Sequence, residues 1–239
     1  MPDSATSPDF VPTQRTRVRR MHERGRYDRK TVYAILDAAL VCHVGYVIDG
    51  LPYVTPTLFW REGEQLYWHG SSASRMLRQQ STGIPVCVTV SHVDGLVVAR
   101  SGFHHSLNYR AVMAFGTAAI VADEAIKTAG LNAFVERLYP RRNQQIRPIL
   151  PQELKATTLM SMVIEEVSAK VRTGGPVDDE ADYALDCWAG VIPIEARVGA
   201  AIPDERLKPG IPLLDGLRHW VEGGALPEII GALTRSADE

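Results

Sequence analysis

Short β-forming runs joined by tight turn signals dominate the first half of the chain and limit the folds it can adopt. The segment "VCHVGYVIDGLPYVTPTLFW" reads as two strands joined by Asp49-Gly50, a dipeptide suited to a two-residue type I′ hairpin. A third strand is predicted at "LYWH", and "PVCVTVSHVDGLVVARS" is predicted to fold back at Asp94-Gly95 in the same way. These signals favour antiparallel pairing, because a two-residue turn can join only antiparallel neighbours.

The second half of the chain adds further strands. A long apolar strand is predicted in "NYRAVMAFGTAAIVAD", where Gly116 suggests a bulge. Late strands are predicted in "TLMSMVIEEVSAKVR" and "CWAGVIPIEARV". Helices are interposed between strands rather than alternating with them: one is capped by Asp28 and runs to about Leu40, and another follows Asp123 and ends at Pro140. The pattern predicts a mainly β protein, an antiparallel barrel with peripheral helices.

The chain divides into three predicted regions. Residues 1–27 form an N-terminal tail and a basic arm, residues 28–200 form the barrel domain, and residues 201–239 form a Pro-rich and weakly helical extension. Residues 15–30 of the arm and its junction carry eight Lys or Arg residues without interleaved aromatic residues. We therefore expect this arm to pack on its own fold or on a partner subunit, with nucleic-acid binding as the less favoured alternative.

Composition excludes several classes of protein. With 45% hydrophobic and 23% charged residues, the chain is typical of a soluble globular protein. Its net charge of -2 gives no general attraction to nucleic acid or anionic lipid, and no apolar run approaches the ~18 residues of a membrane span. The three cysteines are scattered and the N-terminus lacks a signal-peptide pattern, so we expect a cytoplasmic protein.

Two clusters of hydrogen-bond donors indicate an anionic ligand. In "LYWHGSSASRMLRQQ" a predicted strand runs into a short helix that holds Met76 and Leu77 on one face. Serine hydroxyls, the helix N-terminus and the Arg75 guanidinium together suit a phosphate group. In the alternative interpretation one serine caps the helix and Arg75 faces solvent. The second cluster, in "SGFHHSLNYRAV", lies at the start of the long strand and also contains an arginine, Arg110, which favours the ligand interpretation.

The order of these motifs resembles that of the pyridoxamine 5′-phosphate oxidase-like superfamily, the FMN-binding split barrels. The resemblance covers roughly residues 15–215 and follows the order "TPTLFW", "LYWHGSSASRML", "HSLNYRAVMAFGTA", "SAKVRTGGP" and "CWAGVIPI". The chain is most similar to the small flavin-nucleotide-binding proteins of the nitroimidazole-resistance type. The resemblance implies an antiparallel split β-barrel and a homodimer that binds FMN at the subunit interface.

The resemblance also implies the residues of the flavin site. Backbone groups of the stretch containing Thr55, Thr57 and Leu58 would lie along the flavin ring. The next strand would line the ring and ribityl chain, and the serine turn and its arginine would hold the phosphate. The implied cofactor-binding residues of these later segments are Trp68, His69, Gly70, Ser71, Ser74, Arg75, Asn108, Tyr109, Arg110 and, closing the site from the partner subunit, Trp188.

The chain departs from the true pyridoxamine-phosphate oxidases. Arg75 is followed by Met76 rather than by a second basic residue, and the C-terminal region is acidic. Pyridoxamine phosphate is therefore not the expected substrate. We expect an FMN-dependent oxidoreductase that acts on another small molecule and takes electrons from a diffusible donor such as a nicotinamide or deazaflavin cofactor.

The seven histidines bear on whether the protein binds a metal ion and on which residue takes part in catalysis. No pair has the spacing of a metal site, so no metal is expected. His69 is the candidate catalytic residue, beside the flavin and able to donate to a substrate anion or a reduced-flavin nitrogen; in the alternative it only packs against the ribityl chain. Two other functions remain as alternatives: a flavin carrier or sensor without turnover, and a haem-binding split barrel.

Overall fold

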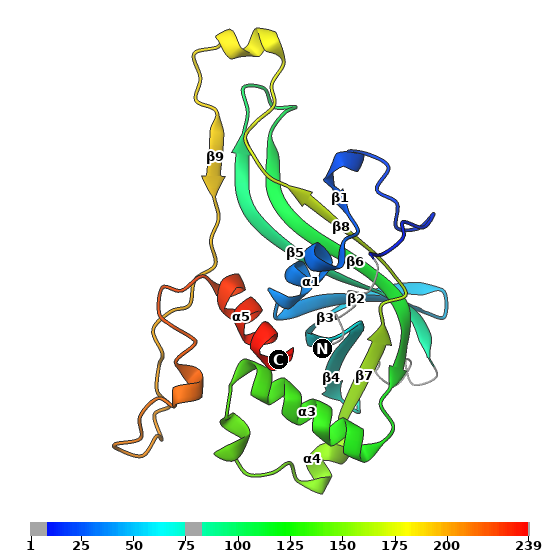
Figure 1. Cartoon of the computed structure of the whole chain (residues 1–239), viewed down its shortest axis with the longest axis vertical. Coiled ribbons are helices and arrows are strands. Elements are labelled where there is room, and N and C mark those ends of the chain that lie inside the picture. The colour runs from blue at the N-terminus through cyan, green and yellow to red at the C-terminus, as the bar shows by residue number, and fades with distance from the viewer. Residues whose placement is uncertain (1–8, 75–82, 239) are drawn as a thin grey trace, which may run out of the picture. The chain divides into compact units, whose positions relative to one another are not determined.

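The computed structural model describes residues 9–74 and 83–238, which form nine strands and several helices (Figure 1). The strands are β1 (Gly25–Arg26), β2 (Val41–Ile48), β3 (Leu51–Glu62), β4 (Gln65–Ser71), β5 (Ile84–Val98), β6 (Ser106–Ile120), β7 (Thr157–Val163), β8 (Glu166–Arg172) and β9 (Gly190–Pro193). The α-helices are α1 (Arg29–Asp37), α3 (Glu124–Leu138), α4 (Pro151–Ala156) and α5 (Leu226–Asp238). Short 3-10 turns are η1 (His22–Arg24), η3 (Arg142–Gln144), η4 (Glu180–Ala184) and η5 (Asp215–Leu217). The short helix predicted around Met76 and Leu77 lies outside the described residues.

The strands pair in antiparallel fashion, which confirms the predicted mainly β class with peripheral helices. The pairs with a defined register are β1–β8, β2–β3, β3–β4, β4–β7, β5–β9, β6–β7 and β6–β8. The chain folds into two compact units, and the long strands β5 and β6 contribute residues to both. Unit 1 comprises Met1–Leu36, Cys87–Phe115 and Ile164–Glu195, and unit 2 comprises Asp37–Val86, Gly116–Val163 and Ala196–Glu239.

Unit 2 is built on the predicted hairpin. Asp49 and Gly50 join β2 to β3 with φ values of 51° and 77°, so both residues have the positive φ that a type I′ turn requires. The alternation of side chains along the strands buries one face of each, and fully buried residues of β4 and β7 fill the core. These residues are Leu66, Trp68, Leu159, Met160 and Met162.

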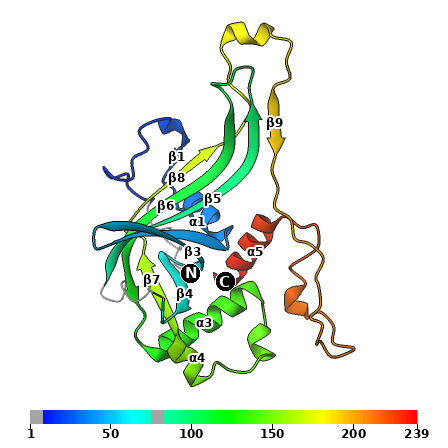
Figure 2. The ribbon, with the colours of Figure 1, turned by 180° about the vertical axis from the view of Figure 1, so that it is seen from behind.

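Helices α3 and α5 lie side by side in unit 2, as both views show (Figures 1 and 2). The side chain of Asp123 accepts hydrogen bonds from the first turn of α3, as predicted. The extension predicted to be weakly helical contains a 13-residue helix, α5, and Ile230 and Leu233 on one face of it are 3% exposed. Burial of this face, rather than local propensity, explains why a helix of this length forms in the extension.

Unit 1 contains the N-terminal arm, α1 and the paired strands β8 and β6. Asp28 caps α1 as predicted, since its Oδ1 accepts a hydrogen bond from Thr31 N at 2.8 Å. The Arg15 guanidinium forms an ion pair with Glu166 and lies 4.3 Å from the centroid of the Phe115 ring. The basic arm therefore packs on its own unit, one of the two arrangements expected for it.

The hairpin predicted at Asp94-Gly95 is wrong, because β5 runs through both residues. The Asp94 carboxylate instead accepts two hydrogen bonds from Arg110 of β6, at 2.8 and 2.9 Å. Gly95 lies opposite Pro193 of β9, where an added Cβ would be 3.0 Å from Ile192 O. The glycine therefore permits a close approach between two strands and does not form a turn.

The late strands also differ from the prediction. The run predicted as one strand at residues 158–172 divides into β7, which pairs with β4, and β8, which pairs with β6. The strand predicted near Trp188 is only the four residues of β9. Gly116, where we expect a bulge, is the point at which β6 changes partner: an added Cβ there would lie 2.2 Å from Val163 O.

Candidate functional site

Strand β4 places Trp68 and His69 on opposite faces, because successive side chains of a strand alternate. The Trp68 side chain is completely buried at 0% exposure, and its Nε1 has no hydrogen-bond partner among the described residues. Since the residue as a whole is buried, neither its indole nor its backbone is exposed here, and its role beside the flavin stays a prediction.

His69 lies in an aromatic cluster formed by β3, β4 and α3. Its ring centroid is 5.0 Å from that of Phe134 and 6.3 Å from that of Trp60, and Trp60 stacks on Tyr67 at 5.3 Å. The Nδ1 atom of His69 is buried and has no hydrogen-bond partner among the described residues. Burial lowers the pKa of His69 below its usual value, so the imidazole is held neutral and able to donate a lone pair.

The residues that are predicted to lie along the flavin ring, Thr55, Thr57 and Leu58, all belong to β3. Thr55 and Thr57 are half-buried and alternate with exposed residues, including Leu58 at 42% exposure. The Thr55 hydroxyl is hydrogen-bonded to that of Tyr46 at 3.0 Å. The two threonines share a face with the buried Cys42 and Val44 of β2, and the more exposed face of β3 carries Val54, Pro56 and Leu58.

The serine turn follows directly after β4. Gly70 is half-buried, and Ser71 Oγ accepts a hydrogen bond from Ala73 N at 3.2 Å. The backbone N of Ser74 donates to Ser71 O at 2.8 Å, which closes a tight turn. Arg75, the predicted phosphate ligand, lies outside the described residues. The turn presents serine hydroxyls at the end of β4, and the arginine that would complete the site stays a prediction.

The second predicted donor cluster lies in unit 1 and is largely engaged in internal bonds. Asn108 is 8% exposed and its Nδ2 donates to Gly174 O at 3.1 Å. Arg110 is committed to its ion pair with Asp94, and Tyr109 is half-buried. Of these three residues, Asn108 is a structural residue and Arg110 already has a carboxylate partner.

Arg172 at the end of β8 is a feature that the sequence analysis missed. The residue is 7% exposed, and its Nη atoms donate to Asn108 Oδ1 and to the carbonyl oxygens of Gly174 and Gly175. Its Nε is buried without a partner among the described residues. Burial, and then the charge of Arg24, lower the pKa of Arg172. The residue lies in the segment "SAKVRTGGP" quoted for the family resemblance, but an arginine shortly before a glycine pair is too common to identify such a site.

Trp188 precedes β9 and is 64% exposed, with its indole ring near Gly190. The side chain is therefore exposed in the single chain, and its role in closing the site of a partner subunit stays a prediction.

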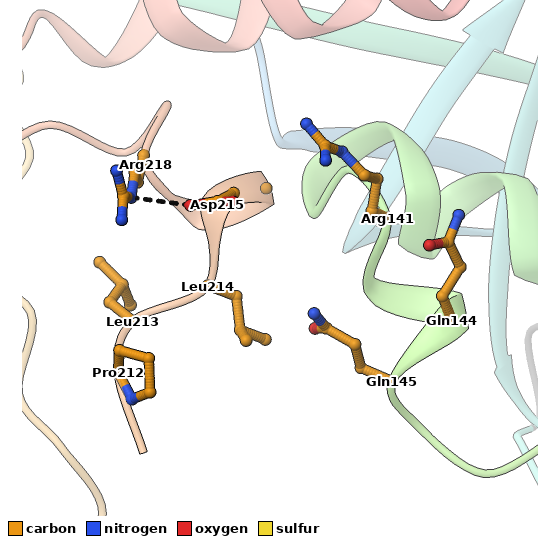
Figure 3. Close-up of a pocket in the computed structure, with 9 residues that line it drawn as sticks. Arg141, Gln144, Gln145, Pro212, Leu213, Leu214, Asp215 and Arg218 are labelled. Carbon is orange, nitrogen blue, oxygen red and sulfur yellow. Dashed lines mark ion pairs between the residues drawn. The ribbon is translucent and has the colours of Figure 1, made fainter. Parts of the chain in front are cut away.

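Two cavities lie in unit 2 between the turn after α3 and the extension. One, of about 230 Å³, is polar and is lined by Arg141, Gln144, Gln145 and the segment 212–218 (Figure 3). The other, of about 370 Å³, is apolar and is lined by residues including Ile202, Leu207 and Leu217. None of the predicted flavin residues lines either cavity.

Two kinds of feature are absent from residues 9–74 and 83–238. Within them no group of three or more His, Cys, Asp or Glu side chains is arranged to hold a metal ion. No helix in the same ranges is long and apolar enough to cross a membrane.

Similarity to solved structures extends over most of the chain. The flavocytochrome Anf3 from Azotobacter vinelandii has 46% sequence identity and a TM-score of 0.84, and the match covers 90% of this chain and 100% of that one. The FAD and haem binding protein from Mycobacterium smegmatis has 34% identity and a TM-score of 0.80, covering 85% of this chain and 98% of that one. A Bacteroides thetaiotaomicron protein assigned to 5-nitroimidazole antibiotic resistance shares the fold at 22% identity and a TM-score of 0.50, covering 62% of this chain and 86% of that one.

A search of the curated proteins finds no match. The family model described as pyridoxamine 5′-phosphate oxidase matches residues 28–171, which is more than half of the chain. This match and the structural relatives agree with the antiparallel strand pairing and with the resemblance seen in the motifs. The chain belongs to the pyridoxamine 5′-phosphate oxidase-like family of flavin-binding split barrels.

Proposed function

We propose that this protein binds both a flavin and a haem and acts as an oxidoreductase that transfers electrons between them. The observation that carries the proposal is the extent of its similarity to two proteins described as a flavocytochrome and as an FAD and haem binding protein. The family model ends at residue 171, whereas the flavocytochrome match covers 90% of the chain and leaves at most about 24 residues unmatched. The match must therefore include much of the region after residue 171, beyond the part shared by the whole family.

His69 is the residue that we propose as the haem ligand. A histidine ligates haem iron through a neutral ring nitrogen, and burial favours the neutral form of His69. Its Nδ1 is buried without a partner among the described residues, so Nε2 is the nitrogen that would reach the iron, and Trp60 and Phe134 supply the apolar contacts that a macrocycle requires. The proposed role as haem ligand replaces the catalytic role beside the flavin that the sequence predicted for His69.

The other six histidines fit this role less well. His92 Nε2 lies 3.0 Å from Ile35 O, His105 Nδ1 lies 2.7 Å from Ser101 O, and His104 lies 3.5 Å from the Asp179 carboxylate. The remaining three, His22, His43 and His219, have exposed side chains. Among the seven, His69 alone combines burial, aromatic neighbours and an unpartnered nitrogen.

We propose that the flavin is held by β3, β4 and the serine turn. When bound, the two groups supply two-electron chemistry at the flavin and one-electron chemistry at the haem. The chain's own part is to bind and orient them: the backbone of β3 would lie along the flavin, and Ser71, Ser74 and Arg75 would hold the flavin's phosphate. The aromatic residues around His69 exclude water from the ligand nitrogen. The electron donor is proposed to be a diffusible nicotinamide or deazaflavin cofactor.

We propose FAD rather than FMN as the flavin. The Mycobacterium smegmatis relative is described as binding FAD, and FMN, which the family resemblance implied, is the alternative. The absorbance spectrum and extracted cofactors of freshly purified protein test both parts of the proposal. We expect a Soret band together with flavin absorbance, and FAD in the acid extract. Cells supplied with a haem precursor serve as the control for haem shortage; a flavin spectrum with no Soret band from such cells would contradict the haem assignment.

We propose further that the protein is a homodimer in the cytoplasm. The β2–β3 hairpin exposes apolar side chains that a second copy could cover. Val41, Val47, Val54 and Leu58 share one face and are between 42% and 66% exposed, and Leu51 on the other face is 59% exposed. Light scattering should give twice the chain mass. Val54→Asp should shift the protein toward monomer, while Val11→Asp, at a 79% exposed position outside the hairpin, should not. A parent protein that is monomeric with its flavin bound would exclude the dimer.

A further inference from the structure

The apolar cavity of unit 2 has no part in the flavin and haem sites proposed above. Its volume of about 370 Å³ falls within the ~300–1,000 Å³ that is usual for small-molecule sites. The wall is formed by residues between 201 and 217 of the extension and by Arg142 of η3. None of the residues proposed to hold the flavin or the haem lines it.

The aliphatic side chains of this wall are more exposed than those of a protein core. Leu207, Ile211 and Leu213 are 45%, 48% and 50% exposed, and Ile202 is 92% exposed. Several aliphatic side chains that meet water around one hollow would gain free energy if an apolar group covered them. The wall therefore suits the aliphatic body of a ligand.

Arg142 is the charged residue in the lining of the cavity. The residue is half-buried, and its guanidinium makes no hydrogen bond or ion pair with another described residue. No aspartate or glutamate in the described part of the chain lines the cavity. The N–H donors of Arg142 are therefore available to an oxyanion, and a carboxylate can accept two of them at once.

Two contacts fix the wall beside the end of α3. Gly216 is buried against Pro140, where an added Cβ would lie 1.6 Å from Pro140 O. The indole Nε1 of Trp220 donates a hydrogen bond to Leu138 O at 2.8 Å. The segment that carries the aliphatic wall is thus held next to η3, so a ligand would meet a cavity that is already formed and would lose less free energy in ordering it.

We propose that this cavity binds a small monoanion with an aliphatic body, of the class of medium-chain carboxylates. The aliphatic chain lies against the side chains of the extension, such as Leu213 and Leu217, and Arg142 holds the carboxylate. The single unpaired cation matches a single negative charge, and the apolar wall matches the chain. This site is additional to the proposed flavin and haem sites and does not depend on either of them.

The test is isothermal titration calorimetry of the purified protein with decanoate, decanol and acetate. Decanoate should bind more tightly than the other two, because it alone offers both the aliphatic chain and the carboxylate. Arg142→Gln should weaken decanoate binding by about 10-fold, the lower end of the range for a hydrogen bond to a charged group, since Arg142 is only half-buried. The same variant should leave the affinity for decanol unchanged.

The neighbouring arginine provides the matched control. Arg141 is also a cation of the turn after α3, but it lines the polar cavity instead of the apolar one (Figure 3). Arg141→Gln should leave decanoate affinity unchanged. If Arg141→Gln weakened decanoate binding and Arg142→Gln did not, the assignment of the carboxylate to Arg142 would be wrong.

A second pair of variants tests the apolar wall. Ala201→Trp places a large side chain in the cavity and should weaken decanoate and decanol alike by more than about 10-fold, because it occupies the space in which the chain would be buried. Ala200→Trp changes the preceding exposed alanine, which does not line the cavity, and should affect neither ligand. Circular dichroism checks that each variant is folded.

Three results would overturn the proposal. The first is a parent protein that shows no saturable binding of decanoate. The second is folded Arg142→Gln that binds decanoate as tightly as the parent. The third is Ala201→Trp that keeps the parent's decanoate affinity but has a different molecular mass in light scattering, since a second copy of the chain would then cover this wall.

Discussion

Replacing His69 by alanine should abolish haem binding and leave the flavin in place. The proposed ligand nitrogen, Nε2, belongs to a neutral, half-buried imidazole that packs beside Trp60 and Phe134 and whose Nδ1 is buried. Mutation of groups that merely orient a metal ligand costs about 10- to 100-fold in affinity, so loss of the ligand itself should exceed about 100-fold. Titration of haem into haem-free protein, followed at the Soret band, measures the change.

Two comparisons make this result specific to His69. His105→Ala removes an exposed histidine whose Nδ1 lies 2.7 Å from Ser101 O, and it should leave haem affinity unchanged. His69→Met offers a different ligand atom at the same position and should change the position of the Soret band instead of removing it. Haem binding by His69→Ala with the parent's affinity and spectrum would show that another residue ligates the iron.

Replacing Asp37 by alanine should lower the free energy of unfolding by about 3–5 kcal/mol, the range measured when one partner of a buried ion pair is removed. The Asp37 carboxylate accepts hydrogen bonds from Arg61 Nε at 2.8 Å and Nη2 at 2.6 Å, and the two side chains are only 9% and 7% exposed. Without Asp37 the Arg61 guanidinium would keep its bond to Gly63 O but would lose the buried counter-charge seen here. Urea denaturation of parent and variant measures the difference.

An exposed ion pair in unit 2 provides the control. Arg147 pairs with Glu153 through two hydrogen bonds, but these side chains are 60% and 44% exposed. Glu153→Ala should therefore change stability far less than Asp37→Ala, because water replaces the lost partner. The double variant Asp37→Ala/Arg61→Leu should recover part of the loss, since it removes the buried guanidinium together with the carboxylate that it faces. Equal effects of Asp37→Ala and Glu153→Ala would contradict the assigned role of burial.

The sequence determined those features whose partners are only a few residues away. The turn at Asp49-Gly50 and the helix caps Asp28 and Asp123 are formed as predicted, because each depends on the φ values or backbone N–H groups of its immediate neighbours. The antiparallel class followed from the same local signals, since tight turns between β-forming runs permit no other pairing. The order of the motifs was sufficient to identify the family, because it reflects the order in which the strands and turns follow one another along the chain.

Only the tertiary structure decided between alternatives that look alike locally. Asp94-Gly95 is the same dipeptide as Asp49-Gly50, yet it continues strand β5. The reason is that Arg110 forms hydrogen bonds with Asp94 and β9 pairs with β5 at Gly95. Strand alternation separated Trp68 from His69, but the fold decided that the indole faces the core and the imidazole faces an aromatic cluster. Arg172 lies in the segment "SAKVRTGGP", but no role was predicted for it there, because what distinguishes it is burial beside Asn108, a residue 64 positions away. Burial and long-range pairing depend on which segments meet, and the local sequence does not encode that choice at any one position.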